Sequence, residues 1–427
     1  MIENKSQKIH MINMGCKLNT FEGNAITANL KDKGYIICDQ QEDADIVIVN
    51  TCTVTAKADD KGRKYMRRAK NQGKKVIATG CYATTDGMEL AEENYIDLIL
   101  RNEQKFSIHE YLPLLNLGQK LVDGKDDTEF PEVSGFERTR AFLKIQDGCD
   151  KFCSFCKIPF ARGRSRSQSP QKIRKAFQLL LEAGYKEIVL TGINLSDYTS
   201  EEGCLGAMVQ SLLAFDGDFR VRLSSLQPDE FDPILLDCLA HPKMAPHFHL
   251  SVQSGSDSVL KRMFRHYDSH TFLALISKIR AIRPDAGITT DIIVGFPNET
   301  EEEFEETLEI IRKAQFSRIH IFPYSRREGT TAARMHDFAP SIKKNREERL
   351  RIVYQETALK FAQEYCLGKP YKALTETAKQ GVREAYTENY IRVHFKESDT
   401  ALNEFIYILP TSVVIDKDGN LLFKTYT

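Results

Sequence analysis

The sequence lacks the features that mark a membrane or secreted protein. None of its apolar runs is long enough to span a bilayer, and residues 1–8 are not followed by the apolar core of a secretory signal. An excess of charge is missing too, because 59 Lys and Arg stand against 60 Asp and Glu, for a net charge of −1. Any nucleic-acid surface must therefore be a local patch. We expect a cytoplasmic protein with neither membrane nor DNA as a partner.

No low-complexity tract or short repeat interrupts the chain, and a hydrophobic content of 41% is enough to form packed cores. The length of 427 residues predicts about two to four domains. Ten cysteines without an export signal indicate a reducing compartment. In that setting cysteines favour metal binding or catalysis over disulfides.

Three of these cysteines lie close together at the spacing C-x3-C-x2-C: Cys149, Cys153 and Cys156. The apolar run 141–145 precedes them and predicts a strand that ends in a ligand-bearing loop. Three thiolates satisfy three irons of a four-iron cluster and leave the fourth iron open for a substrate or cofactor. Phe155 would shield such a cluster from water. The alternatives are a zinc site or buried thiols, but zinc sites usually pair C-x2-C with a second couple of ligands.

Three more cysteines each follow a strand-like run in the first 118 residues. The runs 9–15, 46–51 and 76–80 lead to Cys16, Cys52 and Cys81. Helix-like stretches at 22–33 and 56–72 separate the runs, and this order predicts a parallel sheet. The carboxyl ends of parallel strands meet at one edge, so these three cysteines should converge as a second iron–sulfur site. The alternative is three unrelated buried thiols, which is how we interpret Cys38, Cys204, Cys238 and Cys366.

Six strand candidates alternate with helices in the central region. The strands are expected at 141–146, 187–194, 220–227, 247–253, 287–295 and 318–324, and the helices at 170–183, 205–215, 230–240, 256–283 and 301–314. Six β/α units predict a partial, open TIM-like barrel whose chemistry collects at the carboxyl ends of the strands. His247 and His249 alternate along one strand, and we interpret them as structural.

The rest of the chain predicts a helix and a small β domain. Residues 341–365 form a charged amphipathic pattern, and short alternating runs with a turn at 416–420 predict a small antiparallel β barrel. The α/β chain is thus divided into an N-terminal parallel α/β sheet domain, 1–118, a polar linker, 119–138, the barrel, 139–340, a connecting helix, 341–367, and the β barrel, 368–427. Lys plus Arg equal Asp plus Glu in the last segment, so its charge does not indicate RNA binding.

These motifs resemble a known family. The C-x3-C-x2-C stretch, with its aromatic residue before the last cysteine, resembles the radical S-adenosylmethionine (SAM) superfamily. The segments 15–19, 50–54 and 79–81 resemble the N-terminal motifs of the methylthiotransferases within that superfamily, and the likeness covers nearly the whole chain. It implies two [4Fe-4S] clusters as well as SAM. One cluster, on Cys149, Cys153 and Cys156, would reduce SAM; the other, on Cys16, Cys52 and Cys81, would carry the sulfur. It also implies that the C-terminal β barrel is similar to the TRAM domain.

The resemblance and the strand ends together imply the SAM contacts. These are Phe155, Gly192, Asn194, Ser225, Gln253, Asp291 and Tyr324. The segment 191–194 departs from the Gly-Gly-Glu sequence that many radical SAM proteins carry, although it fits the methylthiotransferase version.

Two basic stretches are candidates for binding RNA phosphates. One is the helix expected after Cys52, and the other is 162–166, where alternate arginines would fan to one side of an extended segment. The candidate residues are Lys57, Arg63, Arg67, Arg162, Arg164 and Arg166. A solvated helix face is the alternative for the helix.

The motifs 15–19 and 158–163 most resemble the branch that modifies C2 of N6-threonylcarbamoyladenosine beside the tRNA anticodon. We therefore predict a radical SAM tRNA methylthiotransferase that acts on the anticodon stem-loop and requires an electron donor. Two alternatives keep the chemistry and change the substrate, to an isopentenyl-adenosine tRNA or to an aspartate of a ribosomal protein. A third is a non-catalytic iron–sulfur protein that binds RNA.

Overall fold

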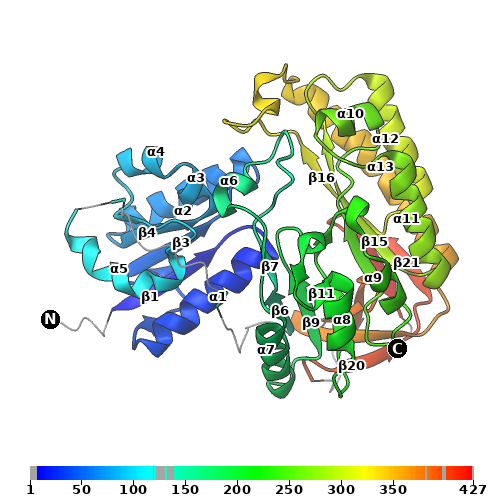
Figure 1. Ribbon diagram of the computed structural model, residues 1–427, viewed down its shortest axis with the longest axis horizontal. Helices are drawn as coiled ribbons and strands as arrows, with labels where there is room; N and C mark the ends of the chain where they lie inside the picture. Colours follow the sequence, from blue (N-terminus) through cyan, green and yellow to red (C-terminus); the bar gives the residue numbers. More distant parts are fainter. Residues whose placement is uncertain are drawn as a thin grey trace.

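The computed structural model describes residues 7–118, 120–121, 130–131, 139–379, 382–396 and 401–425. The predicted linker, 119–138, lies outside these residues except for 120–121 and 130–131. Figure 1 shows the N-terminal domain on the left and the central barrel with its outer helices on the right, with the C-terminal β domain below the barrel. No helix among the described residues combines the length and the apolar character needed to cross a membrane.

The N-terminal domain is built on a five-stranded parallel sheet of order β2-β1-β3-β4-β5. Its strands are β1 (Lys8–Asn13), β2 (Ile36–Ile37), β3 (Ile46–Thr51), β4 (Lys75–Gly80) and β5 (Leu98–Ile99). Its α-helices are α1 (Lys17–Asp32), α2 (Ala56–Asn71), α3 (Cys81–Thr85), α4 (Gly87–Glu92) and α5 (Ile108–Tyr111). Because β1, β3 and β4 are neighbours in the sheet, their carboxyl ends meet at one edge, as predicted.

The first helix begins earlier than the sequence pattern indicates. It was expected from residue 22, but α1 starts at Lys17, directly after Cys16. The cause is its burial pattern, because polar Asn19 and Glu22 lie on the buried face together with Leu18 and Phe21. Apolar periodicity does not identify buried polar residues as part of a helix, so it placed the start of this helix too late.

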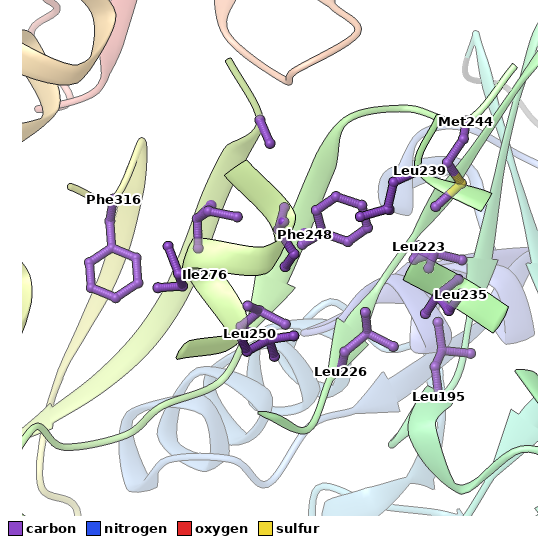
Figure 2. Packing of buried hydrophobic residues seen from close by; sticks show 14 of the residues in the cluster. Leu195, Leu223, Leu226, Leu235, Leu239, Met244, Phe248, Leu250, Ile276 and Phe316 are labelled. Atoms are coloured by element: carbon purple, nitrogen blue, oxygen red, sulfur yellow. The ribbon is translucent and has the colours of Figure 1, made fainter. Parts of the chain in front are cut away.

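The central domain contains six parallel strand positions in chain order, as predicted. They are β6 (Arg140–Lys144), β9 (Glu187–Thr191), β12 (Arg220–Leu223) with its continuation β13 (Ser225–Leu226), β14 (His247–Leu250), β15 (Gly287–Val294) and β16 (Arg318–Pro323). The hydrogen-bonded orders β12-β9-β6 and β13-β14-β15-β16 join at Ser224. Leu223, Leu226, Phe248 and Leu250 pack beneath the outer helices, as Figure 2 shows.

Helices cover the outside of this barrel. They are α7 (Pro170–Glu182), α8 (Leu205–Leu213), α9 (Pro233–Cys238), α10 (Asp257–Arg262), α11 (Ser269–Ile282) and α12 (Glu301–Ala314). The short helix α6 (Ile158–Arg162) lies instead against α3 of the N-terminal domain (Figure 1). The single helix expected at 256–283 is wrong, because the chain breaks between α10 and α11 where Phe264 takes a positive φ of 60°. Thr300 and Glu303 form a capping box that fixes the start of α12.

The long helix α13 (Pro340–Tyr365) leads from the barrel into a six-stranded sheet of order β20-β17-β18-β19-β22-β21. Its strands are β17 (Tyr371–Lys379), β18 (Val382–Thr387), β19 (Arg392–Lys396), β20 (Phe405–Ile408), β21 (Ser412–Ile415) and β22 (Leu421–Lys424). All its pairs are antiparallel except β19 with β22. The β-rich domain is therefore confirmed, with one parallel pair that strand patterns alone did not indicate.

Candidate functional site

The first cysteine trio lies in the loop after β6 and the short strand β7 (Gln146–Asp147). Gly148 opens this loop with a φ of +74°, and a Cβ there would come within 2.0 Å of the Arg164 carbonyl oxygen. Only glycine fits such a close backbone approach. The Cys149 amide donates to the Gly163 carbonyl, and the Ser154 amide donates to the Met263 carbonyl. The loop is thus tied to the end of α6 and to the end of α10.

The three thiols of this loop interact with one another. Desolvation raises the pKa of Cys156 to about 12, and Cys153 and Cys149 raise it further. Desolvation also raises the pKa of Cys149 to about 11, with Cys153 again among the causes. Arg265 is the nearby cation that acts against these shifts, and its guanidinium lies 5.9 Å from the centre of the Phe155 ring. Thiols this basic are protonated near neutral pH, so metal binding must release protons.

The second trio comes from three separate strand ends and converges as predicted. Cys16 follows β1, Cys52 follows β3, and Cys81 begins α3 after β4. Desolvation raises the pKa of Cys52 to about 12, and the neighbouring thiols of Cys16 and Cys81 add to that shift. Gly15 allows the approach, because a Cβ there would lie 2.6 Å from the Cys52 sulfur. All ten cysteines are unpaired, so both trios have the three free thiols that a four-iron cluster with one open iron requires.

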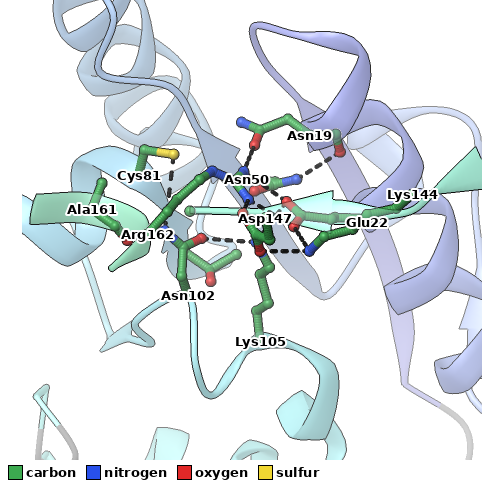
Figure 3. Close-up of polar contacts among 12 residues, drawn as sticks. Asn19, Glu22, Asn50, Cys81, Asn102, Lys105, Lys144, Asp147, Ala161 and Arg162 are labelled. Atoms are coloured by element: carbon green, nitrogen blue, oxygen red, sulfur yellow. Dashed lines mark hydrogen bonds and ion pairs between the residues drawn. The ribbon is translucent and has the colours of Figure 1, made fainter. Parts of the chain in front are cut away.

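A buried ionic network joins the two cysteine-bearing domains, which we call the interdomain network: Glu22, Lys105, Lys144, Asp147 and Arg162 (Figure 3). Arg162 contacts Glu22 at 2.9 Å and Asp147 at 3.1 Å. Lys105 and Lys144 contact Glu22 at 2.6 and 2.8 Å. All five side chains are buried. Buried charges persist only when they are paired this closely, so the network fixes the two domains against each other.

This network corrects one predicted RNA contact. Arg162 is only 2% exposed, so it faces the interdomain network and not an RNA surface. The segment is not extended at this point, because Arg162 ends helix α6. Arg164 is exposed and pairs with Asp150, while Arg166 is half-buried and pairs with Asp147. The three arginines therefore point to different environments.

The interdomain network also reaches the second trio. Asn102 donates from Nδ2 to the Ala161 carbonyl oxygen at 2.7 Å, and the same nitrogen lies 3.9 Å from the Cys81 sulfur. Burial alone would lower the pKa of Arg162, but the Cys81 thiol, together with Glu22 and Asp147, raises it well above its ordinary value. Neither Asn102 nor Glu22 carried a signal in the sequence, because their partners lie up to 140 residues away.

A second set of contacts joins the N-terminal domain to the barrel. Arg327, in the loop after β16, pairs with Asp59 of α2 at 2.6 Å. It also donates to the Thr53 hydroxyl. Close by, the Ser325 hydroxyl accepts from the Ala56 amide at 3.0 Å. The first turn of α2 therefore lies against the loop at the carboxyl end of the last barrel strand.

The predicted SAM contacts lie at or near the carboxyl ends of the strands, but in different settings. Gly192 and Asn194 follow β9, where a Cβ on Gly192 would meet the Gln146 side chain at 2.7 Å and the Asn194 amide donates to that same side chain. Ser225 is half-buried on β13, and Gln253 takes a positive φ of 67° after β14. Tyr324 is buried in an apolar cluster with Phe296 and Phe155, so it supports the loop of the first trio.

Asp291 lies lower in the barrel and forms a polar cluster with two histidines. Its Oδ2 lies 3.1 Å from His249 Nε2, and the ligand atoms of His249, Asp291 and His320 all lie within 4.8 Å of one another. His247 is buried, and its Nε2 lies 3.1 Å from the Thr289 hydroxyl. These contacts fit the interpretation of His247 as structural. The side chains of His249, Asp291 and His320 form a polar cluster inside the barrel, which we call the polar wall.

Helix α2 presents its basic side chains to different partners. Lys57 and Arg67 are exposed, whereas Arg63 is half-buried and donates to the Tyr82 and Asp60 side chains. Lys57, Lys61 and Lys64 are exposed and form no ion pair among the residues that the structure describes. The candidate phosphate-binding face is therefore carried mainly by these lysines.

Comparisons with known proteins agree with this architecture. Residues 8–101 match the family described as "Uncharacterized protein family UPF0004", and residues 143–311 match the radical SAM superfamily. Among solved structures, the radical S-adenosylmethionine methyltransferase TsrM from Kitasatospora setae is similar, with a TM-score of 0.57, 14% identity and coverage of 77% of this chain and 74% of that chain. At that identity the likeness concerns the fold alone.

Relatives of similar length match most of the chain. The threonylcarbamoyladenosine tRNA methylthiotransferase MtaB of Bacillus subtilis is 36% identical, with 92% of each chain covered. The protein of the same name from Thermotoga maritima is 38% identical, with 89% of each covered. A tRNA-2-methylthio-N(6)-dimethylallyladenosine synthase of Cereibacter sphaeroides is 34% identical, with 88% of each covered. With its two cysteine trios and its barrel, the chain belongs to the radical SAM tRNA methylthiotransferase family, and it is a transferase.

Proposed function

We propose that this enzyme places a methylthio group on C2 of N6-threonylcarbamoyladenosine beside the tRNA anticodon. Support comes from relatives that carry this activity in their names, at 36 and 38% identity over about nine-tenths of the chain. The structural observation that carries the proposal is the juxtaposition of two three-cysteine sites on two domains joined by a buried ionic network.

Two [4Fe-4S] clusters and SAM are the cofactors of this proposal. Cys149, Cys153 and Cys156 would hold one cluster, and Cys16, Cys52 and Cys81 the other. When bound, these groups supply a deoxyadenosyl radical and the sulfur to be inserted, which a carbon without an acidic proton requires. Arg162, which pairs with Glu22 of one domain and Asp147 of the other, would hold the two sites in place, and Phe155 with its apolar neighbours would exclude water.

The RNA would approach over α2. Its first turn lies against the loop after β16, so the exposed Lys57, Lys61 and Lys64 extend outward from the carboxyl end of the barrel. Phosphates of an anticodon stem-loop on these lysines would bring the adjacent base to the barrel mouth. The proposal includes a cytoplasmic location, because tRNA and reduced thiols occur there, and it includes an electron donor.

A second substrate has some support. The Cereibacter sphaeroides relative is named for a dimethylallyl adenosine and is only slightly less similar, at 34% identity. A ribosomal-protein aspartate and a non-catalytic RNA-binding role have no such support from these relatives.

One anaerobic assay separates these substrates. Cluster-loaded enzyme is given SAM, dithionite and equal amounts of two anticodon stem-loops, one with threonylcarbamoyladenosine and one with dimethylallyladenosine. Mass spectrometry of the nucleosides should detect the methylthio product on the first RNA at a rate at least tenfold higher. Preference for the second RNA would reassign the substrate, and absence of deoxyadenosine would contradict catalysis altogether.

A further inference from the structure

Lys17 lies at an unusual position between the second cysteine trio and the interior of the barrel. It is the first residue of α1 and directly follows Cys16. Its ammonium nitrogen lies 6.0 Å from the ring centre of Tyr390, a residue of the C-terminal domain that also contacts the first barrel strand through Arg140. The side chain therefore extends from the N-terminal domain into the interior of the barrel, towards the end at which the barrel strands begin.

The charges around Lys17 leave its ammonium without a carboxylate of its own. The groups that interact with it electrostatically include Tyr390, Arg140, Arg222 and Glu187. Glu187 is already held by Arg222 at 2.7 Å and by Arg220. No carboxylate of the described residues forms an ion pair with Lys17.

The histidines and the aspartate near Lys17 do not provide a free carboxylate for it either. His247 and His320 both interact electrostatically with Lys17, and each has its pKa lowered, chiefly by desolvation. Asp291, the carboxylate of the polar wall, is hydrogen-bonded to His249. The half-buried ammonium of Lys17 lies 6.0 Å from the Tyr390 ring centre and has no carboxylate partner among the described residues, so an anion would stabilise it there.

Another cation, Arg162, interacts with the second trio. The charged groups that interact with Cys16 are Arg162, Cys81 and Glu22, and Arg162 also acts on Cys52. The interdomain network thus supplies a cation to these thiols, while the ammonium of Lys17 lies over the ring of Tyr390.

We propose that Lys17 binds the carboxylate of the threonylcarbamoyl group and so selects the carboxylated substrate. The inference rests on the proposed function and adds the residue that would recognise this substrate. A purine that enters the barrel from the mouth has its sugar outside, because the sugar is attached at N9. The N6 substituent then leads into the lumen, where the carboxylate would meet Lys17. A dimethylallyl group has no charge to offer there.

The test compares binding of cluster-loaded enzyme to three fluorescently labelled anticodon stem-loops. They carry threonylcarbamoyladenosine, its methyl ester or unmodified adenosine. The wild type should bind the acid at least about 30-fold more tightly than the ester, as expected when one partner of a desolvated charge pair is removed. Lys17→Gln should bring the two affinities within about threefold of each other. Lys17→Arg should restore part of the preference, because it keeps the charge.

The controls separate this role from a structural one. The iron content should be unchanged in Lys17→Gln, which shows that both sites still assemble, and Lys57→Gln should weaken the binding of all three RNAs equally. A Lys17→Gln enzyme that still prefers the acid would overturn the inference, as would a wild type that binds acid and ester alike. A wild type that forms no methylthio product on the acid RNA would instead overturn the proposed substrate.

Discussion

The six candidate cluster ligands divide into two sets whose loss should have different consequences. Cys149, Cys153 and Cys156 share one loop and one electrostatic environment, with Arg265 as the neighbouring cation. Cys16, Cys52 and Cys81 belong to another domain and have Arg162 as their cation. Each set is therefore expected to assemble and function independently of the other.

Cys149→Ala should abolish SAM cleavage. Cys52→Ala should still cleave SAM but should no longer insert sulfur. Each variant should lose roughly four of the eight iron atoms expected per chain. Deoxyadenosine, methylthio nucleoside and iron are measured on the same samples. Cys38→Ala is the matched control, because Cys38 lies in the N-terminal domain but belongs to neither trio. If both variants cleaved SAM equally poorly, the division of roles would be wrong.

Arg162 carries a charge that its carboxylates do not fully balance. The interdomain network has the three cations Arg162, Lys105 and Lys144 but only the two carboxylates Glu22 and Asp147. The excess positive charge faces Cys81, which is the first electrostatic cause of the raised pKa of Arg162. A cation beside a thiolate-bound cluster stabilises its reduced form.

Arg162→Met should therefore lower the reduction potential of the second cluster. The shift is expected at roughly 60 mV if the lost interaction is worth about 1.4 kcal/mol. The measurement is a redox titration followed by electron paramagnetic resonance in a Cys149→Ala background, which isolates this cluster. Arg164→Met, which alters an exposed arginine two residues away, should leave the potential unchanged. An unchanged potential in Arg162→Met would show that the arginine only joins the domains.

Among the structural elements, the loop of the first trio depends on one glycine. Gly148→Ala should displace the loop, because a Cβ would come within 2.0 Å of a backbone carbonyl oxygen. We expect the variant to lose most of the iron of the first cluster and most SAM cleavage. Gly184→Ala is the control, because its φ of +85° is similar but nothing lies within 4 Å of the added carbon. It should cost about 1 kcal/mol of stability and no iron.

Helix α2 allows a test of the RNA surface. Replacing Lys57, Lys61 and Lys64 with Gln should weaken binding of an anticodon stem-loop and reduce the slope of log affinity against log salt by about two to three. Affinities are measured by fluorescence anisotropy at several salt concentrations. The control replaces Lys172, Lys278 and Lys313 on the outer helices, which changes the net charge equally. Equal loss of slope in both triple variants would rule out α2 as a specific surface.

The elements also show what the sequence could and could not predict. The strands that end at Cys16, Cys52 and Cys81 were predictable, because apolar runs identify strands and parallel topology brings their ends together. The role of Arg162 was not, because an alternating pattern of arginines does not reveal that the first one ends a helix and is buried. The C-terminal runs 371–374, 390–395, 405–409 and 421–423 indicated four strands, but β18 and β21 were missed because their sequences alternate weakly.

At the scale of the whole molecule, three domains meet at Tyr390. Its hydroxyl accepts from Arg140 of the barrel at 2.8 Å, and Lys17 of the N-terminal domain lies over its ring. Desolvation alone would raise the pKa of Tyr390, but Arg140, Lys17 and Arg222 lower it to about 8. An unfolded tyrosine titrates near pH 10. A group with a lowered native pKa adds stability above its unfolded pKa, and that stability is lost as the pH falls through the native value.

Tyr390→Phe should therefore make the stability of the enzyme less dependent on alkaline pH. The thermal midpoint of the wild type should rise relative to that of the variant between about pH 8 and pH 10, by the equivalent of roughly 2 to 3 kcal/mol. The phenolate absorbance difference between the two proteins should show one group titrating near pH 8. Tyr407→Phe, at a position 77% exposed, should follow the wild type throughout. A constant difference in midpoint would mean that Tyr390 contributes its hydrogen bond alone, and that the charges of Lys17, Arg140 and Arg222 do not converge on its ring.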